Sequence, residues 1–385
     1  MSTIINARSP YYVKAEKSAG AFFIDGEVTF KIYIYSGVLQ QDKPITPTYT
    51  ITKNPSNGNN LSYEVIEISE LIRDFLYTKY YQEAQDAVWV EVDMSFTEQP
   101  FNVQRTINRD YLAFDGFGLF KEGALPRTST DPTSSSYTPQ LLQDNKTVYF
   151  VKGDVIRIPL FSEAESEIVT TVASSGQWDL VTAFWDAYSA NWDSSSTTQN
   201  IVDTDDSNDK IQYLSIASGS VEDGDTITIT STQGNLQYDV ITLRELCDPK
   251  YTPIRLIFYN KYGALQDVYV NKKSTLSVKV KDEKYNINTF DLDTLNYSTN
   301  DATMQRFNVQ AKESIKVNTD FIVEELNEPI KQMLVSENVW VDNGVDVLPV
   351  IIKDTSFTEK THVNDKLIQY TFNLEYAFDH IQNVR

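Results

Sequence analysis

The clearest signal in this chain is the alternation of hydrophobic and polar residues in many short segments. Val28, Phe30, Ile32 and Ile34 alternate with other residues in the segment 28–35. Successive side chains of a strand point to opposite faces, so this pattern predicts a strand with one buried face. The same pattern predicts further strands in the segments 87–96, 148–161, 224–232, 236–243, 254–260, 262–271, 276–281, 338–341, 347–357 and 366–378. The chain is therefore predicted to be mainly β.

One segment of the first third of the chain has helical spacing instead. Ile68, Leu71, Ile72 and Phe75 fall at positions i, i+3, i+4 and i+7, which predicts one apolar helix face. Ser69 is available as the N-terminal cap of this helix.

A second helix is predicted near 328–335. Asn327 is its expected N-cap, and Pro329 stands in the first turn, where its missing N–H costs nothing. Strands interrupted by a single helix are typical of sandwich domains. The predicted fold class is therefore mainly β, a multi-domain β-sandwich (Ig-like or jelly-roll-like) with two short helices.

The predicted domain boundaries follow changes of composition. Residues 121–147 are rich in Ser, Thr and Pro, which indicates a linker or a long loop. We predict an N-terminal β-sandwich domain at 1–120 and a C-terminal β domain at 248–385. Between them, 121–247 is predicted to be a variable, loop-rich β module, for which insertion into a larger frame is one interpretation.

Composition and charge exclude several classes of protein. A hydrophobic content of 41% is enough for real cores, and 385 residues favour two or three domains. The net charge of −21 repels phosphate backbones, so we expect no nucleic-acid partner. No apolar run is long enough to span a membrane, and no signal peptide is visible. A single cysteine, Cys247, favours folding in a reducing cytoplasm.

Catalytic motifs are missing from the sequence. The two histidines, His362 and His380, have no helical metal-binding spacing, and surface or otherwise satisfied histidines are the expected interpretation. No G-x-S-x-G turn and no phosphate-binding glycine loop occurs. We therefore predict no enzymatic activity and no cofactor.

An acidic segment offers the best metal-binding candidate. In the stretch DTDDSND, Asp203, Asp205 and Asp209 supply oxygen ligands at a spacing suited to calcium. The stretch lacks the glycine and the distal glutamate of an EF-hand loop, and a merely solvated loop is the alternative.

Aromatic residues gather in the middle of the chain. Trp178, Trp185, Tyr188 and Trp192 lie within fifteen residues and include three of the five tryptophans. One interpretation is that Trp178, Phe184 and Trp185 fill the core of the middle module. The other is an exposed patch that binds a partner protein or stacks on a sugar ring.

Several motifs resemble those of one group of proteins. N-K-Y-G-A and K-K-S occur within 254–281, and L-V-S-E-N-V-W, P-V-I-I-K-D-T-S-F and N-D-K-L-I-Q-Y occur within 328–385. The opening R-S-P-Y-Y-V-K and the later E-I-S-E-L-I-R-D-F-L add to the pattern. The chain resembles structural proteins of the tail or head-to-tail connector of tailed phages infecting Bacteroidota, crAss-like phages among them. The resemblance covers about half of the chain and leaves out 115–245.

This resemblance implies a non-enzymatic virion component that folds in the host cytoplasm before assembly. Its expected partners are further copies of itself, in a ring or other oligomer such as a collar or tail tip, and other virion proteins. The alternative is a carbohydrate- or receptor-binding module of a phage tail. In that case the aromatic residues of the middle module would contact a host surface glycan or receptor.

Overall fold

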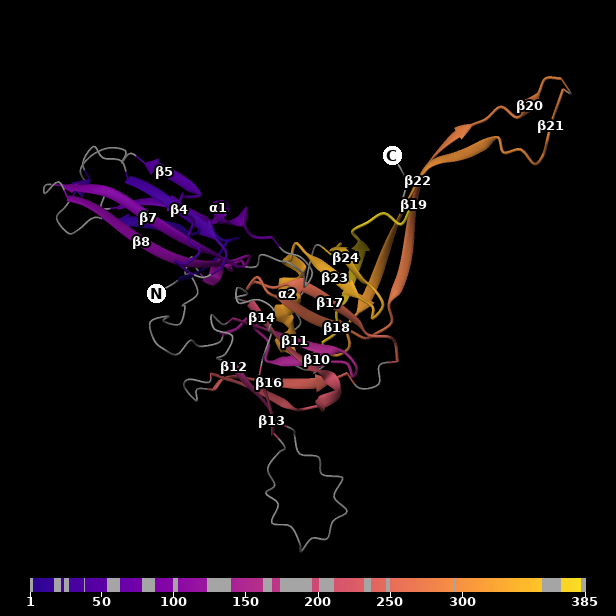
Figure 1. The fold of residues 1–385 in the computed structure, drawn as a ribbon. Coiled ribbons are helices and arrows are strands. Elements are labelled where there is room, and N and C mark those ends of the chain that lie inside the picture. The colour runs from indigo at the N-terminus through magenta and orange to yellow at the C-terminus, as the bar shows by residue number, and fades with distance from the viewer. Residues whose placement is uncertain are drawn as a thin grey trace, which may run out of the picture. The chain divides into compact units, whose positions relative to one another are not determined.

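The computed structural model describes most of the chain. The described residues are 3–16, 22–23, 28–37, 39–53, 63–77, 87–99, 103–122, 140–161, 168–173, 196–200, 211–231, 237–246, 250–293, 295–354 and 368–381. These residues form six β-sheets and two short α-helices, which confirms the mainly β prediction (Figure 1).

The chain divides into two compact units. Unit 1 comprises Met1–Leu246 and Tyr259–Gln266, and unit 2 comprises Cys247–Phe258 and Asp267–Arg385. The division into three domains predicted from composition stays a prediction.

A six-stranded sheet forms the first part of unit 1. Its order is β1-β8-β7-β4-β5, with β3 paired to the end of β7, and only the β1–β8 pair among these strands is parallel. A two-stranded sheet, β2–β6, and helix α1 accompany it. The elements are β1 (Thr3–Asn6), β2 (Tyr12–Glu16), β3 (Phe22–Phe23), β4 (Val28–Tyr35), β5 (Tyr49–Lys53), β6 (Tyr63–Glu67), α1 (Ser69–Arg73), β7 (Ala87–Gln99) and β8 (Val103–Phe114).

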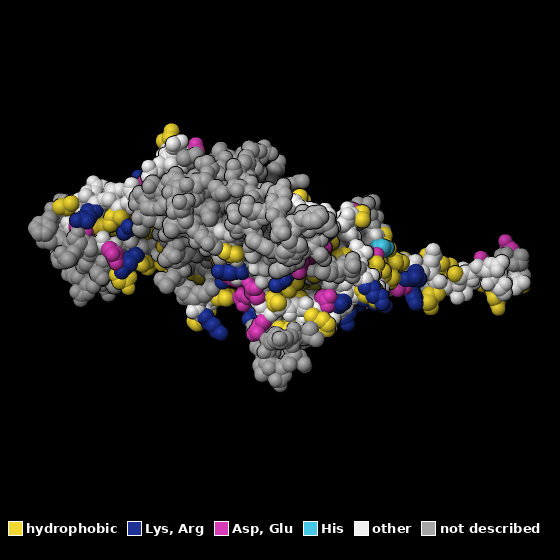
Figure 2. Space-filling model, turned by 90° about the horizontal axis from the view of Figure 1, so that it is seen from below, with side chains coloured by type: hydrophobic (Ala, Val, Ile, Leu, Met, Phe, Trp, Pro, Cys, Tyr) yellow, Lys and Arg dark blue, Asp and Glu magenta, His cyan; other side chains and the backbone are white. Residues whose placement is uncertain are grey.

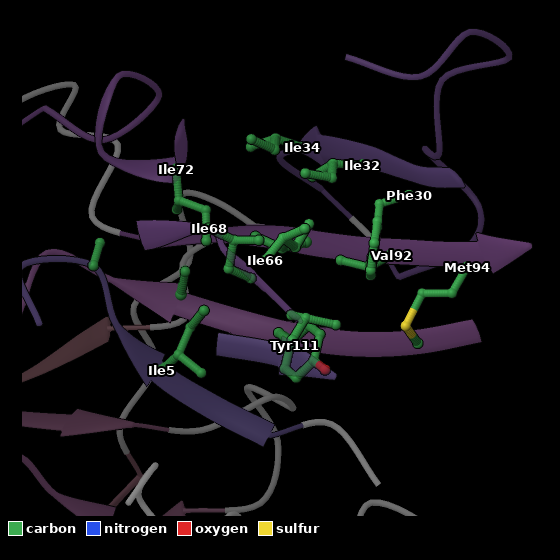
Figure 3. Close-up of a cluster of buried hydrophobic side chains, with 14 of the residues drawn as sticks. Ile5, Phe30, Ile32, Ile34, Ile66, Ile68, Ile72, Val92, Met94 and Tyr111 are labelled. Atoms are coloured by element: carbon green, nitrogen blue, oxygen red, sulfur yellow. The ribbon is translucent and has the colours of Figure 1, made fainter. Parts of the chain in front are cut away.

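One face of this sheet forms the largest described core with β2, β6 and α1 (Figure 3). The residues predicted to face inward from 28–35 are all buried there, together with Val88, Val90, Val92, Met94 and Phe96 of β7. Ile68 and Ile72 of the first predicted helix pack into the same core. The alternation in both strands is thereby confirmed, because every second residue contributes to one core.

The opposite face of the sheet forms a second core. Tyr35 and Trp89 lie there with Phe114, Ile211 and Ala264. These residues come from the N-terminal sheet, from the middle of the chain and from the turn at 260–264. The end of the sheet around Tyr35 and Trp89 is therefore covered on both faces, whereas Lys31, on the same face of β4, is exposed.

The rest of unit 1 contains a five-stranded and a three-stranded sheet. Their orders are β10-β16-β15-β12-β13 and β14-β11-β9, and buried residues of five of these strands share one core. The elements are η1 (Phe120–Glu122), β9 (Gln140–Leu141), β10 (Thr147–Phe150), β11 (Val155–Phe161), β12 (Ile168–Ala173), β13 (Ser196–Asn200), β14 (Ile211–Ala217), η3 (Ser218–Ser220), β15 (Thr226–Ser231) and β16 (Gln237–Glu245).

Unit 2 is built on a seven-stranded sheet of order β18-β17-β23-β24-β25-β22-β19. A two-stranded sheet, β20–β21, lies between β19 and β22 in the sequence. The elements are β17 (Ile254–Tyr259), β18 (Leu265–Val270), β19 (Thr275–Asn286), β20 (Phe290–Asp291), β21 (Asn296–Tyr297), β22 (Met304–Asn318), η4 (Glu324–Leu326), α2 (Asn327–Val335), β23 (Val339–Asp342), β24 (Val347–Ile352) and β25 (Thr371–Tyr376). The predicted C-terminal strands and the predicted second helix are thus confirmed, with β24 and β25 shorter than predicted. Residues 355–357 and 366–367 of the predicted strands lie outside the described residues.

Both predicted helix caps are wrong. The N-cap positions are Ile68 and Leu326, and neither makes a side-chain capping bond. The Ser69 hydroxyl instead accepts the N–H of Tyr11 at 2.8 Å and donates to the carbonyl of Ser9 at 2.6 Å. The Asn327 side chain accepts the hydroxyl of Tyr370 at 2.7 Å. In both cases the side-chain oxygen that was predicted to cap the helix forms a hydrogen bond with a residue distant in the sequence.

The N-K-Y-G-A segment forms the hairpin turn between β17 and β18. Asn260 closes the turn, because its carbonyl accepts the Gly263 N–H at 3.0 Å and its side chain accepts the Tyr262 N–H at 2.9 Å. Gly263 has a φ of +77°, and a Cβ there would lie 2.9 Å from the backbone carbon of Asp115. Glycine is therefore required here both for conformation and for close backbone approach.

We expect Gly263→Ala to lower the free energy of unfolding of unit 1 by roughly 2–4 kcal/mol, from left-handed strain plus overpacking against backbone. Gly153→Ala is the matched control, because Gly153 has a φ of +99° but no atom would lie within 4 Å of a Cβ at that position. It should cost only about 1–2 kcal/mol. Chemical denaturation of both variants checks this. Equal losses would show that the approach to Asp115 does not matter.

Candidate assembly surface

Strands β19 and β22 continue past the rest of their sheet as a hairpin, which we call the arm (residues 275–318). It projects from the other strands of unit 2 and carries β20 and β21 at its tip (Figures 1 and 2). Pairing runs from Thr275 opposite Lys316 to Asn286 opposite Met304. The arm is therefore an antiparallel ribbon along its whole stem.

Side chains as well as backbone hold the two strands of the arm together. The Arg306 guanidinium lies 2.9 Å from the carboxylate of Asp282, close to the shift in register between Lys281 and Glu283. The rings of Tyr285 and Phe307 meet edge to face, with 5.5 Å between their centroids. These contacts lie in the outer half of the stem, and both strands stay paired there.

The apolar face of β19 is left open to solvent. Leu276, Val278 and Val280 share this face and are 57%, 49% and 47% exposed. Ile315 and Ala311, opposite Leu276 and Val280 on β22, are buried. Ile315 lies in the part of β22 that pairs with β25, and the carbonyl of Ala311 accepts the N–H of His380, whereas β19 is the last strand in the order of the described sheet.

The tip of the arm also presents apolar side chains to solvent. These exposed residues are Phe290, Leu292, Leu295, Tyr297 and Met304. Leu295 has a φ of +51°, a left-handed conformation that is unusual for a branched apolar residue. Apolar side chains that gather on an exposed surface mark a site for contact with another molecule.

The stem of the arm is basic within an acidic chain. Six residues of β19 and β22 are basic, against three acidic ones, although the whole chain carries −21. The basic residues are Lys279, Lys281, Lys284, Arg306, Lys312 and Lys316. Lys and Arg side chains are visible along the stem in Figure 2. The arm therefore combines apolar side chains with a local positive charge.

Most candidate residues from the sequence fall outside the described part of the chain. This applies to the aromatic group Trp178, Trp185, Tyr188 and Trp192. It also applies to the calcium candidates Asp203, Asp205 and Asp209. Both sites stay predictions. Among the residues that the structure describes, no group of three or more His, Cys, Asp or Glu could hold a metal ion.

His380 is a partly exposed histidine with hydrogen-bond partners. Its Nδ1 lies 2.8 Å from a carboxylate oxygen of Glu313, and its backbone N–H donates to the carbonyl of Ala311 at 2.9 Å. This confirms the interpretation of His380 as a satisfied surface histidine. His362 lies outside the described residues.

A buried group of charges lies on the N-terminal sheet. Glu91 is 4% exposed, accepts the hydroxyl of Tyr35, and pairs with Lys43 at 2.7 Å. Lys43 also lies 3.3 Å from Asp93 and 4.1 Å from the centroid of the Tyr33 ring. Burial, followed by the hydrogen bond to Glu91, raises the pKa of Tyr35. The carboxylate is thus neutralised by fixed partners, an arrangement typical of a structural ion pair.

No protein-family model matches the chain, and no curated protein matches it at a significant level. Within the described residues, no helix has the length and apolarity needed to cross a membrane. The arm is therefore a candidate contact surface only on the evidence of its exposed apolar residues, its projection from the sheet and its local charge.

Asp110 allows a test of the buried charges around Glu91. It lies opposite Glu91 in the register of β7 and β8. Burial and the nearby Glu91 raise the pKa of Asp110. The folded state then binds the proton more tightly than the unfolded state, so stability falls as pH rises above the ordinary value of 3.8.

We expect Asp110→Asn to raise the free energy of unfolding at pH 7 by up to about 1 kcal/mol, a small gain because Asp110 is only partly buried. The gain should disappear near pH 3, where the aspartate is protonated in both states. Asp74→Asn, at an exposed site, controls for the change of net charge. Denaturation curves at both pH values measure the effect. A gain that persists at pH 3 would refute this account.

Proposed function

We propose that this chain is a non-enzymatic structural protein of a bacteriophage virion. It acts as a tail or connector component, in a ring, collar or tail tip, and assembles through interfaces of its β domains. The observation that carries this proposal is the arm, whose apolar side chains are exposed and are covered by no other part of the chain that the structure describes. The resemblance of 254–281 and 328–385 to structural proteins of tailed phages supports the same function.

The physical argument concerns what the arm gains from a partner. A two-stranded ribbon is marginally stable alone, and burial of apolar surface is worth about 25 cal/mol per Å². Side chains such as Leu276, Leu292 and Leu295 supply no such stabilisation while they are exposed. An arm that inserts between neighbouring subunits would recover it. Extended, exposed ribbons are therefore expected in proteins that assemble.

The remaining features fit assembly from a folded precursor. We propose that the N-terminal sheet and the β2–β6 sheet form a β-sandwich of the Ig-like or jelly-roll-like type around their shared core. A net charge of −21 would keep the chain soluble in the host cytoplasm until assembly. Other virion proteins and further copies of the chain are its proposed partners.

The first test is where the protein is found. Phage particles purified from infected cells should contain the protein in several copies, detected by mass spectrometry of gradient fractions. A protein that never co-fractionates with particles, and stays in the soluble lysate, would contradict the proposed function.

The second test removes apolar contacts at the tip of the arm. A variant with Leu292→Ser, Leu295→Ser and Tyr297→Ser should fold normally, because all three side chains are exposed. Supplied to a phage that lacks the gene, it should be incorporated at least about tenfold less than the native protein. The control is Ile45→Ser with Val345→Ser, at positions 100% and 86% exposed outside the arm. Equal incorporation of both variants would exclude the tip from assembly.

A further inference from the structure

The outer edge of β19 offers backbone hydrogen-bonding groups to a further strand. β19 is twelve residues long and pairs only with β22 in the described sheet. An edge strand of this length is a template for the addition of another strand. Many proteins protect such edges with proline or with a covering helix or loop, but β19 contains no proline and is exposed along most of its length.

The sequence of β19 is complementary to itself in one antiparallel register. When two copies are related by a two-fold axis at Val278, each Val278 faces the Val278 of the other copy. Leu276 then lies opposite Val280, and Val280 opposite Leu276. All three exposed apolar residues thus pair with apolar residues on one face, and such cross-strand pairs stabilise sheets.

The charged residues near the axis agree with the same register. Lys279 then lies opposite Ser277 of the other copy, and Lys281 opposite Thr275. Just before the strand, Lys273 comes opposite Glu283, a pair of opposite charges. Lysines on an edge strand usually discourage pairing, because they meet other charges or are buried. In this register Lys279 and Lys281, the two lysines nearest the axis, avoid other lysines. Lys284 comes opposite Lys272, whose charge is paired with Asp320 at 3.0 Å.

Neighbouring two-fold registers are less favourable. An axis at Lys279 or Lys281 sets a lysine against the same lysine of the other copy. With an axis at Val280, Lys279 faces Lys281, and with an axis at Ser277, Lys281 faces Lys273. Like charges directly opposite one another destabilise a strand pair. The register centred on Val278 is therefore selected by its apolar pairing, and unlike these neighbours it keeps lysines apart close to the axis and adds the Lys273–Glu283 pair.

We infer that the partner of this edge is a second copy of the chain. Two arms pair through their β19 strands in antiparallel orientation, with the two-fold axis at Val278, and join the two seven-stranded sheets into one. This inference rests on the proposed function as an assembly protein and names the partner that the arm takes.

Sedimentation analysis of the purified full-length protein tests the pairing. The native protein should form a dimer, and Val278→Lys should weaken dimerisation at least about 100-fold, because it places two lysines on the axis. Val103→Lys is the matched control, since Val103 is a strand valine with 47% exposure and lies outside the arm. A native protein that stays monomeric, or a dimer unaffected by Val278→Lys, would overturn the inference.

Disulfide cross-linking tests the register itself, in a background in which Cys247 is replaced by alanine. Val278→Cys should give an interchain disulfide on oxidation, because the two positions face each other. Lys284→Cys should not, since its two copies would be displaced by twelve residues, about 40 Å along the strands. Efficient cross-linking through position 284 but not 278 would overturn the register.

These outcomes are separate from those of the virion experiment. A protein that enters particles but does not pair through β19 retains the proposed function and loses this inference. A protein that pairs through β19 but never enters particles retains the pairing and loses the proposed function.

Discussion

An edge strand bonds its neighbour on one side only, and the proposed function of this chain depends on that constraint. In the described sheet of unit 2, β19 has β22 beside it and no further strand, and the hairpin continues beyond the sheet. The backbone groups on its outer edge and its apolar side chains therefore face water. A second surface would satisfy both at once, because strand addition pairs the backbone and brings apolar side chains together.

Charge decides which second surface fits. An acidic chain repels further copies of itself at long range, yet the stem of the arm is locally basic. The stem can therefore approach the same stem only where lysines do not meet near the contact, and the register centred on Val278 offsets Lys279 and Lys281, the two nearest the axis. A two-fold contact closes on itself, so growth into a ring would require other surfaces of the chain as well.

The sequence predicted individual elements better than their surroundings. The strand containing Leu276, Val278 and Val280 was predicted correctly, but alternation cannot show whether an apolar face is covered. Its exposure depends on the position of the strand in the sheet order, which distant parts of the chain determine. Ser69 and Asn327 failed as predicted caps for the same reason, because distant residues bind their side chains. The arm as a binding surface therefore could not be predicted from local pattern.

Amide hydrogen exchange along residues 275–286, measured at low and high protein concentration, tests the central claim most directly. If a second copy covers the outer edge of β19, exchange there should slow as the dimer forms, while the exposed turn at 344–346 should stay unchanged. The contradictory result is a dimer at high concentration in which exchange along β19 is as fast as in the monomer.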